Sequence, residues 1–190
     1  LPEHGFIFCC FNSNYKISPN EFEIWVRILG MVEGSVLWLL KSNKWAEANL
    51  QLEAENRGIS RDRLIFADKL PQAEHLARQR LADLFLDTFN VNAHGSLLTA
   101  IGLPELITET EQEYEALILD LATNPERLAS INDKLSANRL SQPLFNSELF
   151  TKHLEDGYQQ AYQRYFEGLE PATINVMENI RLNQERYLNL

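Results

Sequence analysis

The chain has 190 residues, and 45% of them are hydrophobic, which is enough for one domain with a substantial core. Its formal net charge of −10, without any run of Lys or Arg, argues against nucleic acid as a partner because a phosphate backbone would be repelled. No apolar stretch is long enough to cross a bilayer and the first residues are not a signal peptide, so we expect no membrane association and a cytoplasmic location.

Residues 5–11 predict a first strand. The only two cysteines, Cys9 and Cys10, are adjacent in this apolar run. Neighbouring residues of a strand point to opposite faces of a sheet, so the pair is better interpreted as buried strand residues than as a disulfide or a metal site. Free thiols agree with a reducing cytoplasm.

A helix is predicted from Ser18 to about residue 32. Ser18 can cap it, Pro19 suits the first helical position, and Glu21 completes a capping box. Apolar side chains recur at helical spacing along one face, at Phe22, Trp25, Val26 and Leu29. We interpret these aromatic and aliphatic residues as core packing against a sheet.

Further strands and helices alternate along the next part of the chain. The strands are predicted at 35–40, 64–67 and 84–86, and the helices at 45–57, which Gly58 ends, and from Pro71 onward. This alternation is typical of βαβ units and predicts a parallel sheet, with the order of the strands left open.

The pattern changes after His94. A short helix is expected at 95–101 and an extended piece at 103–107, followed by helices at 110–123, 125–138 and 147–167 and an amphipathic tail helix at 177–190. The fold class predicted is therefore α/β, a Rossmann-like parallel sheet with flanking helices and a helical carboxyl-terminal annex.

Two histidines are expected at the carboxyl edge of this sheet. His75 lies in the first turns of the helix from Pro71, and His94 follows the strand at 84–86. Ligands of parallel sheets bind at this edge, where helix N-termini attract anions. The pattern predicts a phosphate-bearing ligand. Asp83 and Asp87 could serve as a general base, but strand-end aspartates more often hold loops or cap helices.

The amino-acid sequences of several segments resemble those of a known family. These segments are LPQAEHLARQRLADLFLDTFNVNAH at 70–94, FIFCCFNSNYKI at 6–17, VLWLL at 36–40 and RLSQPLF at 139–145. In this order they resemble the carboxyl-terminal catalytic lobe of the O-linked N-acetylglucosamine transferase and SPINDLY family, glycosyltransferase family 41. The resemblance runs from about residue 5 to 168, so residues 1–168 are predicted to form the nucleotide-sugar-binding lobe and 169–190 a helical tail.

The sequence departs from the family after His94. Family members continue into a pair of threonines, a helix bearing an acidic residue, a strand and a loop, whereas His94 here meets Gly95 directly. The family's ribose-binding acid and supporting threonines are absent from this stretch. Both a true deletion and a segment omitted from the sequence explain the break.

The resemblance implies the donor-binding half of a B-type, inverting glycosyltransferase that moves N-acetylglucosamine from UDP-GlcNAc to protein Ser or Thr hydroxyls. Tetratricopeptide repeats and an amino-terminal lobe, which complete the acceptor groove, would precede this part. Leu1 is not an initiator residue, and we expect the fragment alone to bind nucleotide weakly and to be inactive. The alternatives are a GDP-fucose-dependent O-fucosyltransferase of the same family and a non-catalytic interaction module whose tail binds a partner or self-associates.

The resemblance also assigns site residues. Lys16 matches the lysine that contacts the donor diphosphate, and His75 and His94 match histidines beside the phosphates. Ser13 stands where many relatives carry a longer glutamine that reaches the nucleotide. Arg78 would hold the phosphates or the loop, with a plain surface charge as the alternative.

Two further residues are expected near the base of the nucleotide. Leu70 would offer its backbone groups, and Gln72 replaces a lysine that some relatives place against uracil. No Asp-x-Asp pair or His/Cys cluster with metal-ligand spacing occurs in the sequence, so we expect neither a metal nor a cofactor.

Overall fold

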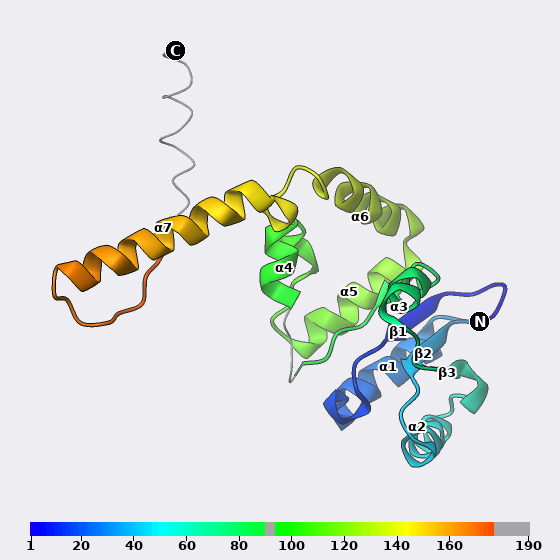
Figure 1. Ribbon diagram of the computed structural model, residues 1–190. Coiled ribbons are helices and arrows are strands. Elements are labelled where there is room, and N and C mark those ends of the chain that lie inside the picture. The colour runs from blue at the N-terminus through cyan, green and yellow to red at the C-terminus, as the bar shows by residue number, and fades with distance from the viewer. Residues whose placement is uncertain (90–93, 177–190) are drawn as a thin grey trace. The chain divides into compact units, whose positions relative to one another are not determined.

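The structure is a computed structural model that describes residues 1–89 and 94–176 (Figure 1). Its contacts divide the chain into two units, Leu1–Ser136 and Ala137–Leu190. The first unit holds the sheet and the predicted site residues. The boundary expected at residue 168 separates a lobe from a tail by function, and it stays a prediction.

Four parallel strands form the sheet in the order β3-β2-β1-β4. The strands are β1 (Ile7–Cys10), β2 (Val36–Leu40), β3 (Leu64–Ala67) and β4 (Leu84–Phe85). In the register, Phe8 of β1 lies between Leu37 of β2 and Leu84 of β4, so the centre of the sheet is apolar on both sides of β1. The parallel pairing confirms the predicted α/β class.

Helices connect the strands and continue beyond them (Figure 1). They are α1 (Pro19–Met31), α2 (Lys44–Asn56), α3 (Gln72–Gln79), α4 (His94–Ala100), α5 (Glu111–Thr123), α6 (Pro125–Asn138) and α7 (Ser147–Phe166). Short 3₁₀ turns lie between them, namely η1 (Asn14–Lys16), η2 (Arg61–Arg63), η3 (Pro104–Leu106) and η4 (Pro143–Phe145).

The start of α1 has the predicted capping box. The Glu21 carboxylate accepts a hydrogen bond from the Ser18 backbone N–H at 2.6 Å, and the Ser18 hydroxyl accepts one from the Glu21 N–H at 3.3 Å. These bonds satisfy donors that a helix start leaves without partners. Trp25 and Phe22 are buried in the core, which confirms their predicted packing role.

The two faces of the sheet carry separate apolar clusters. Cys10 and Phe8 belong to the larger one, with α1 and parts of α2 and α5, whereas Cys9 and Trp38 lie on the other face. The two neighbouring cysteines are therefore buried on opposite faces, as strand geometry predicts. Burial raises the pKa of both thiols to about 12.

We expect Cys9 and Cys10 to be inert in the folded chain. The thiolate is the reactive form, and at pH about 8 the raised pKa leaves very little of it. Ellman's reagent should modify both thiols at least about 100-fold faster in guanidinium chloride than in native buffer. One thiol per chain reacting rapidly without denaturant would contradict this burial.

Two segments differ from the sequence expectation. Residues 103–107 were expected to be extended, but Pro104–Leu106 forms the turn η3, in which the Ile107 N–H donates to the Pro104 carbonyl at 3.0 Å. Proline presets a dihedral angle that suits a tight helical turn as well as an extended strand. The α3 helix begins at Gln72, with Pro71 as the residue before it.

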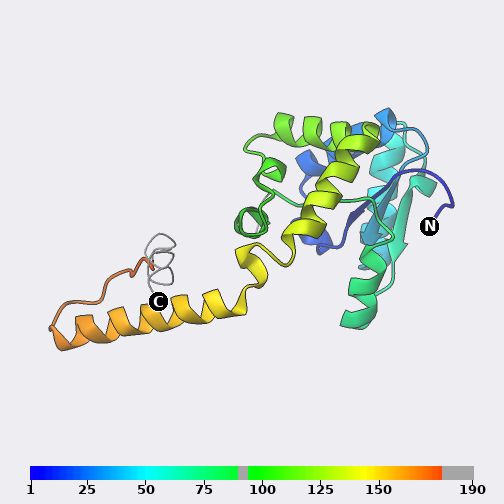
Figure 2. The same ribbon diagram turned by 90° about the horizontal axis from the view of Figure 1, so that it is seen from above.

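The second unit is dominated by α7, a single continuous helix (Figure 2). Its Asn146 cap accepts a hydrogen bond from the Leu149 N–H at 2.9 Å. Large apolar side chains along α7 are exposed, among them Phe150, Tyr158 and Tyr165. The tail helix predicted at 177–190 lies outside the described residues. None of the helices in the described part is long and apolar enough to span a membrane.

Candidate nucleotide-binding site

The strand order changes direction between β1 and β4. The first three strands run outward from β1 to β3, and β4 is then placed on the other side of β1. In open parallel sheets, ligands bind beyond the carboxyl ends of the strands at such a reversal. The loops that follow β1 and β4 therefore define the candidate site, and Lys16 and His94 follow these two strands.

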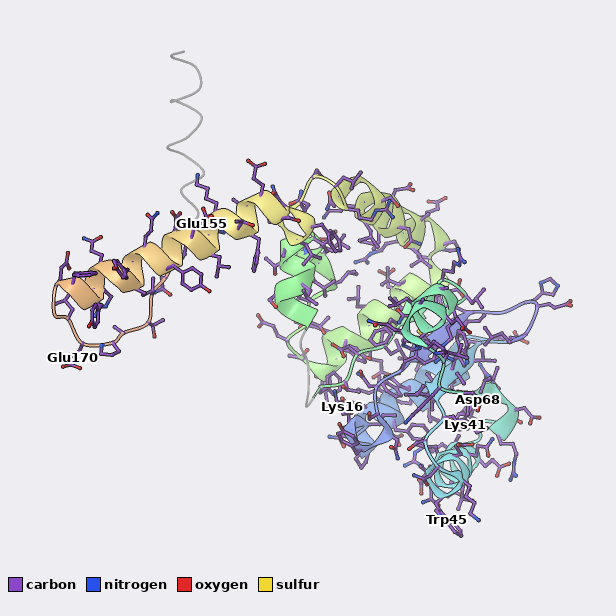
Figure 3. The ribbon with its side chains drawn as sticks, viewed as in Figure 1. Lys16, Lys41, Trp45, Asp68, Glu155 and Glu170 are labelled. Carbon is purple, nitrogen blue, oxygen red and sulfur yellow. The ribbon has the colours of Figure 1, made fainter. Side chains whose placement is uncertain are left out.

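The loop after β1 places Lys16 in the turn η1. The Lys16 backbone N–H donates to the Ser13 carbonyl at 2.9 Å, which closes the turn. The side chain of Lys16 is half-buried, and in the described part of the chain no carboxylate lies within salt-bridge distance of it. Figure 3 labels it beside the start of α1. Its charge is thus available to an anionic ligand.

This loop is also tied to the next one. The Asn14 Oδ1 atom accepts a hydrogen bond from the Ser42 hydroxyl at 2.9 Å, which joins the turn to the connection between β2 and α2. Asn43 in the same connection caps α2 by accepting from the Trp45 and Ala46 backbone N–H groups. The carboxyl ends of β1 and β2 therefore share one hydrogen-bonded rim.

The helix α3 brings His75 to the loop after β1. The ring of His75 lies 5.2 Å from the ring of Phe11, the residue that follows β1 directly, in an edge-to-face arrangement. Leu70 and Gln72 lie at the entry of α3, and both are exposed. The sequence prediction that His75 lies at the carboxyl edge agrees with this position, while the ligand contacts of Leu70, Gln72 and Ser13 stay predictions.

Arg78 is buried rather than exposed on the surface. It donates to the Asp68 backbone carbonyl at 2.6 Å and contacts His75 Nδ1 at 2.8 Å. Its guanidinium also lies 4.7 Å from the ring of Phe11 and 5.7 Å from that of Trp38. Of the three roles considered from the sequence, holding the loop is the one that these contacts favour.

The loop after β4 is held from several sides. Asn12 donates to the Thr88 hydroxyl at 3.1 Å, and the Tyr114 hydroxyl donates to the Asp87 carbonyl at 3.0 Å. The Asp87 carboxylate accepts from the Thr88 N–H at 2.8 Å, which is the loop-holding role expected for strand-end aspartates. His94 is the first residue of α4, and its side chain lies outside the described part.

Asp83 serves the opposite edge of the sheet. Its carboxylate accepts a hydrogen bond from the Ile7 N–H at 2.8 Å, at the start of β1. A general base would have to lie at the carboxyl edge with the candidate site, so this position favours the structural role of Asp83.

Glu21 and Tyr114 support the site, although sequence reasoning gave neither a role there. The buried Glu21 carboxylate accepts from the Phe89 N–H, and the Tyr114 hydroxyl accepts from the Trp25 indole N–H at 3.1 Å. Burial raises the pKa of Tyr114, so this hydroxyl stays protonated and can donate to Asp87. The sequence signal for such a role is a polar side chain on the apolar face of a helix, as Glu21 is in α1.

The described residues contain no group of three or more His, Cys, Asp or Glu side chains that could hold a metal ion. Lys16 and His75 lie at the carboxyl edge of the parallel sheet, which is the edge where ligands of Rossmann-like folds bind.

The chain belongs to glycosyltransferase family 41. The model of this family, described as "Glycosyl transferase family 41", matches residues 1–97 and 91–154. The chain is 34% identical to the "Probable UDP-N-acetylglucosamine--peptide N-acetylglucosaminyltransferase SEC" of Arabidopsis thaliana, over 94% of this chain and 21% of that protein. It is 31% identical to the "UDP-N-acetylglucosamine--peptide N-acetylglucosaminyltransferase" of Caenorhabditis elegans, over 89% of this chain and 17% of that protein.

A solved structure shares the fold. The chain of the "Thermobaculum terrenum O-GlcNAc transferase mutant - K341M" superposes with a TM-score of 0.72 at 25% identity, over 82% of this chain and 36% of that one. The fold is thus confirmed as that of a partial lobe of an O-GlcNAc transferase. The chain spans about a fifth of the length of the curated relatives given above.

The comparisons also bear on the break after His94. The two matched stretches of the family model meet at 91–97, where the sequence departs from the family. The alignment with the Arabidopsis protein runs over 206 positions, which is more than the 190 residues of this chain, so that protein has residues that this chain lacks.

Proposed function

We propose that this chain is the donor-binding half of an inverting glycosyltransferase that moves N-acetylglucosamine from UDP-GlcNAc to Ser or Thr hydroxyls of proteins. The observation that carries the proposal is membership of glycosyltransferase family 41 together with relatives named as UDP-N-acetylglucosamine–peptide transferases. Sugar transfer requires stabilisation of a departing diphosphate. Lys16, half-buried and without a carboxylate partner in the described part, is the side chain we assign to that charge.

In this proposal the remaining site residues divide between the two ends of the nucleotide. His75 and His94 lie with Lys16 at the diphosphate, whereas the Leu70 backbone and Gln72 lie at the base, with Ser13 between them. No metal is assigned, because the Lys16 ammonium and helix N-termini supply the positive charge. Peptide acceptors would bind in a groove that needs the amino-terminal lobe and repeats of the longer protein.

Replacing Lys16 by alanine is expected to weaken UDP binding by roughly tenfold to a hundredfold, because a charge-assisted hydrogen bond to phosphate contributes about 1.5–3 kcal/mol. Calorimetric titration of the 190-residue chain with UDP and with GDP, each with Mg²⁺ and with EDTA, measures this. The matched control is Lys152→Ala, which removes the same charge from the exposed surface of α7. We expect UDP to bind more tightly than GDP, equally well with and without Mg²⁺.

The other possible results of these titrations favour the alternative functions or a different site. Preference for GDP would support the fucosyltransferase alternative. Binding of UDP that Lys16→Ala leaves unchanged would remove Lys16 from the site. If neither nucleotide binds, even after the amino-terminal lobe is supplied, the chain is better described as an interaction module.

A further inference from the structure

Arg78 lacks a carboxylate partner although it is buried. The residue is 9% exposed, and within the described part its guanidinium forms no salt bridge. The nearby Asp68 carboxylate pairs instead with Lys41, at 2.9 Å between Nζ and Oδ1 (Figure 3). Arg78 therefore donates to the Asp68 backbone carbonyl and meets His75 with its charge unneutralised.

The contact with Arg78 determines the tautomer of His75. A guanidinium has only N–H donors and stays protonated in proteins, so His75 Nδ1, 2.8 Å from Arg78 Nη2, can only accept. The proton of the neutral imidazole must then be on Nε2. This nitrogen lies 3.4 Å from the side-chain amide nitrogen of the exposed Gln79, and because two N–H donors form no hydrogen bond with each other, the Nε2–H is left to an anionic oxygen.

Arg78 itself is held by two aromatic rings and by a hydrogen bond at one of its tips. The rings of Phe11 and Trp38 lie at 4.7 and 5.7 Å from its guanidinium carbon, and the Asp68 carbonyl fixes one terminal nitrogen. Among the described residues, its buried Nε has no hydrogen-bond partner. With its carbon over an aromatic face and two nitrogens occupied, the guanidinium is arranged to orient its neighbour.

We propose that Arg78 is a positioning residue that holds His75 as the Nε2–H tautomer, so that this N–H is the donor presented to an anionic oxygen of the nucleotide sugar. The ligand part of this inference rests on the proposed function, whereas the tautomer part does not. Arg78 thereby acts through His75, and Lys41 contributes by keeping the Asp68 carboxylate occupied.

The tautomer can be measured directly in the full chain. Long-range ¹H–¹⁵N correlation spectra at pH about 8, above the ordinary histidine pKa of about 6.5, distinguish protonated from unprotonated ring nitrogens. The chain has four histidines, and His75→Gln identifies the signals of His75. We expect an unprotonated Nδ1 in the native chain and a mixture of tautomers in Arg78→Met, whose apolar side chain can still pack against Phe11 and Trp38.

Two more variants separate positioning from folding. Arg78→Lys keeps a donor-only cation and should restore the Nε2–H tautomer at least in part, and Gln79→Ala should leave the tautomer unchanged. A protonated Nδ1 in the native chain, or the same tautomer in Arg78→Met as in the native chain, would overturn the proposal.

Titration with UDP then tests the ligand part. We expect affinity up to about tenfold lower for Arg78→Met, with partial recovery in Arg78→Lys, and a loss in the double variant His75→Gln/Arg78→Met that is smaller than the sum of the two single losses. Additive losses in the double variant would show that Arg78 does not act through His75. If the tautomer responds as expected but the native chain binds no UDP, the positioning geometry stands and the proposed nucleotide function fails.

Discussion

Replacement of Trp25 by alanine is expected to lower the free energy of unfolding by about 3–5 kcal/mol, the range for large aromatic side chains lost from cores. Trp25 is fully buried in the larger cluster, and its indole N–H donates to the Tyr114 hydroxyl at 3.1 Å. The substitution leaves a cavity beneath the sheet and frees the hydroxyl that holds the Asp87 carbonyl. Guanidinium chloride unfolding followed by circular dichroism measures the change.

Two milder variants divide this effect into packing and hydrogen bonding. Trp25→Phe keeps most of the ring but removes the donor, and Tyr114→Phe removes the hydroxyl that joins Trp25 to Asp87. Because both single variants break the same bond, we expect their double variant to lose less than the sum of the two. A loss below about 1 kcal/mol for Trp25→Ala would show that the cluster does not close around this side chain.

Replacement of Glu21 by alanine is expected to cost about 2–4 kcal/mol and to weaken nucleotide binding. The Glu21 carboxylate accepts from two backbone N–H groups, those of Ser18 and Phe89. A buried donor left without an acceptor costs about 1–3 kcal/mol, and the substitution creates two in a region where Glu21 is fully buried. The contact with Phe89 also fixes the loop after β4, one of the two loops that define the candidate site.

A matched control for Glu21 lies in α5. Glu113 forms the same capping box with Thr110, but it is exposed and accepts only from the neighbouring Glu109 and Thr110 backbone. Glu113→Ala should therefore lower the free energy of unfolding much less than Glu21→Ala does, with nucleotide binding unchanged. Equal losses for the two variants would mean that the Phe89 contact adds nothing, because a helix cap alone would then explain both.

The position of a candidate residue could be predicted where it follows from a strand. His75 was expected at the carboxyl edge and lies there, because a parallel sheet gathers the ends of its strands at one edge. Arg78 stayed open between three roles, since its exposure depends on Phe11, which follows β1, and on Trp38 in the middle of β2. Spacing along one helix carries no information about such neighbours.

Local chemistry alone determined much of this protein. The capping residues Ser18 and Thr110, the apolar runs and the proline starts specify where helices and strands lie, because their interactions involve residues within four positions of each other. The alternation of strands and helices then predicted a parallel sheet. Because Cys9 and Cys10 are neighbours in one strand, the sequence also predicted that they are buried on opposite faces of that sheet.

Only the tertiary structure decided which distant groups support the site. Trp25 and Tyr114 are 89 positions apart, and Glu21 and Phe89 are 68 apart, yet they meet because β4 is placed beside β1 and α5 packs against α1. Strand order and helix docking depend on the fit of whole apolar faces, which is a property of the folded core. Only the tertiary structure also decided the tautomer of His75, since its partner Arg78 contacts the rings of Phe11, which follows β1, and of Trp38 in β2.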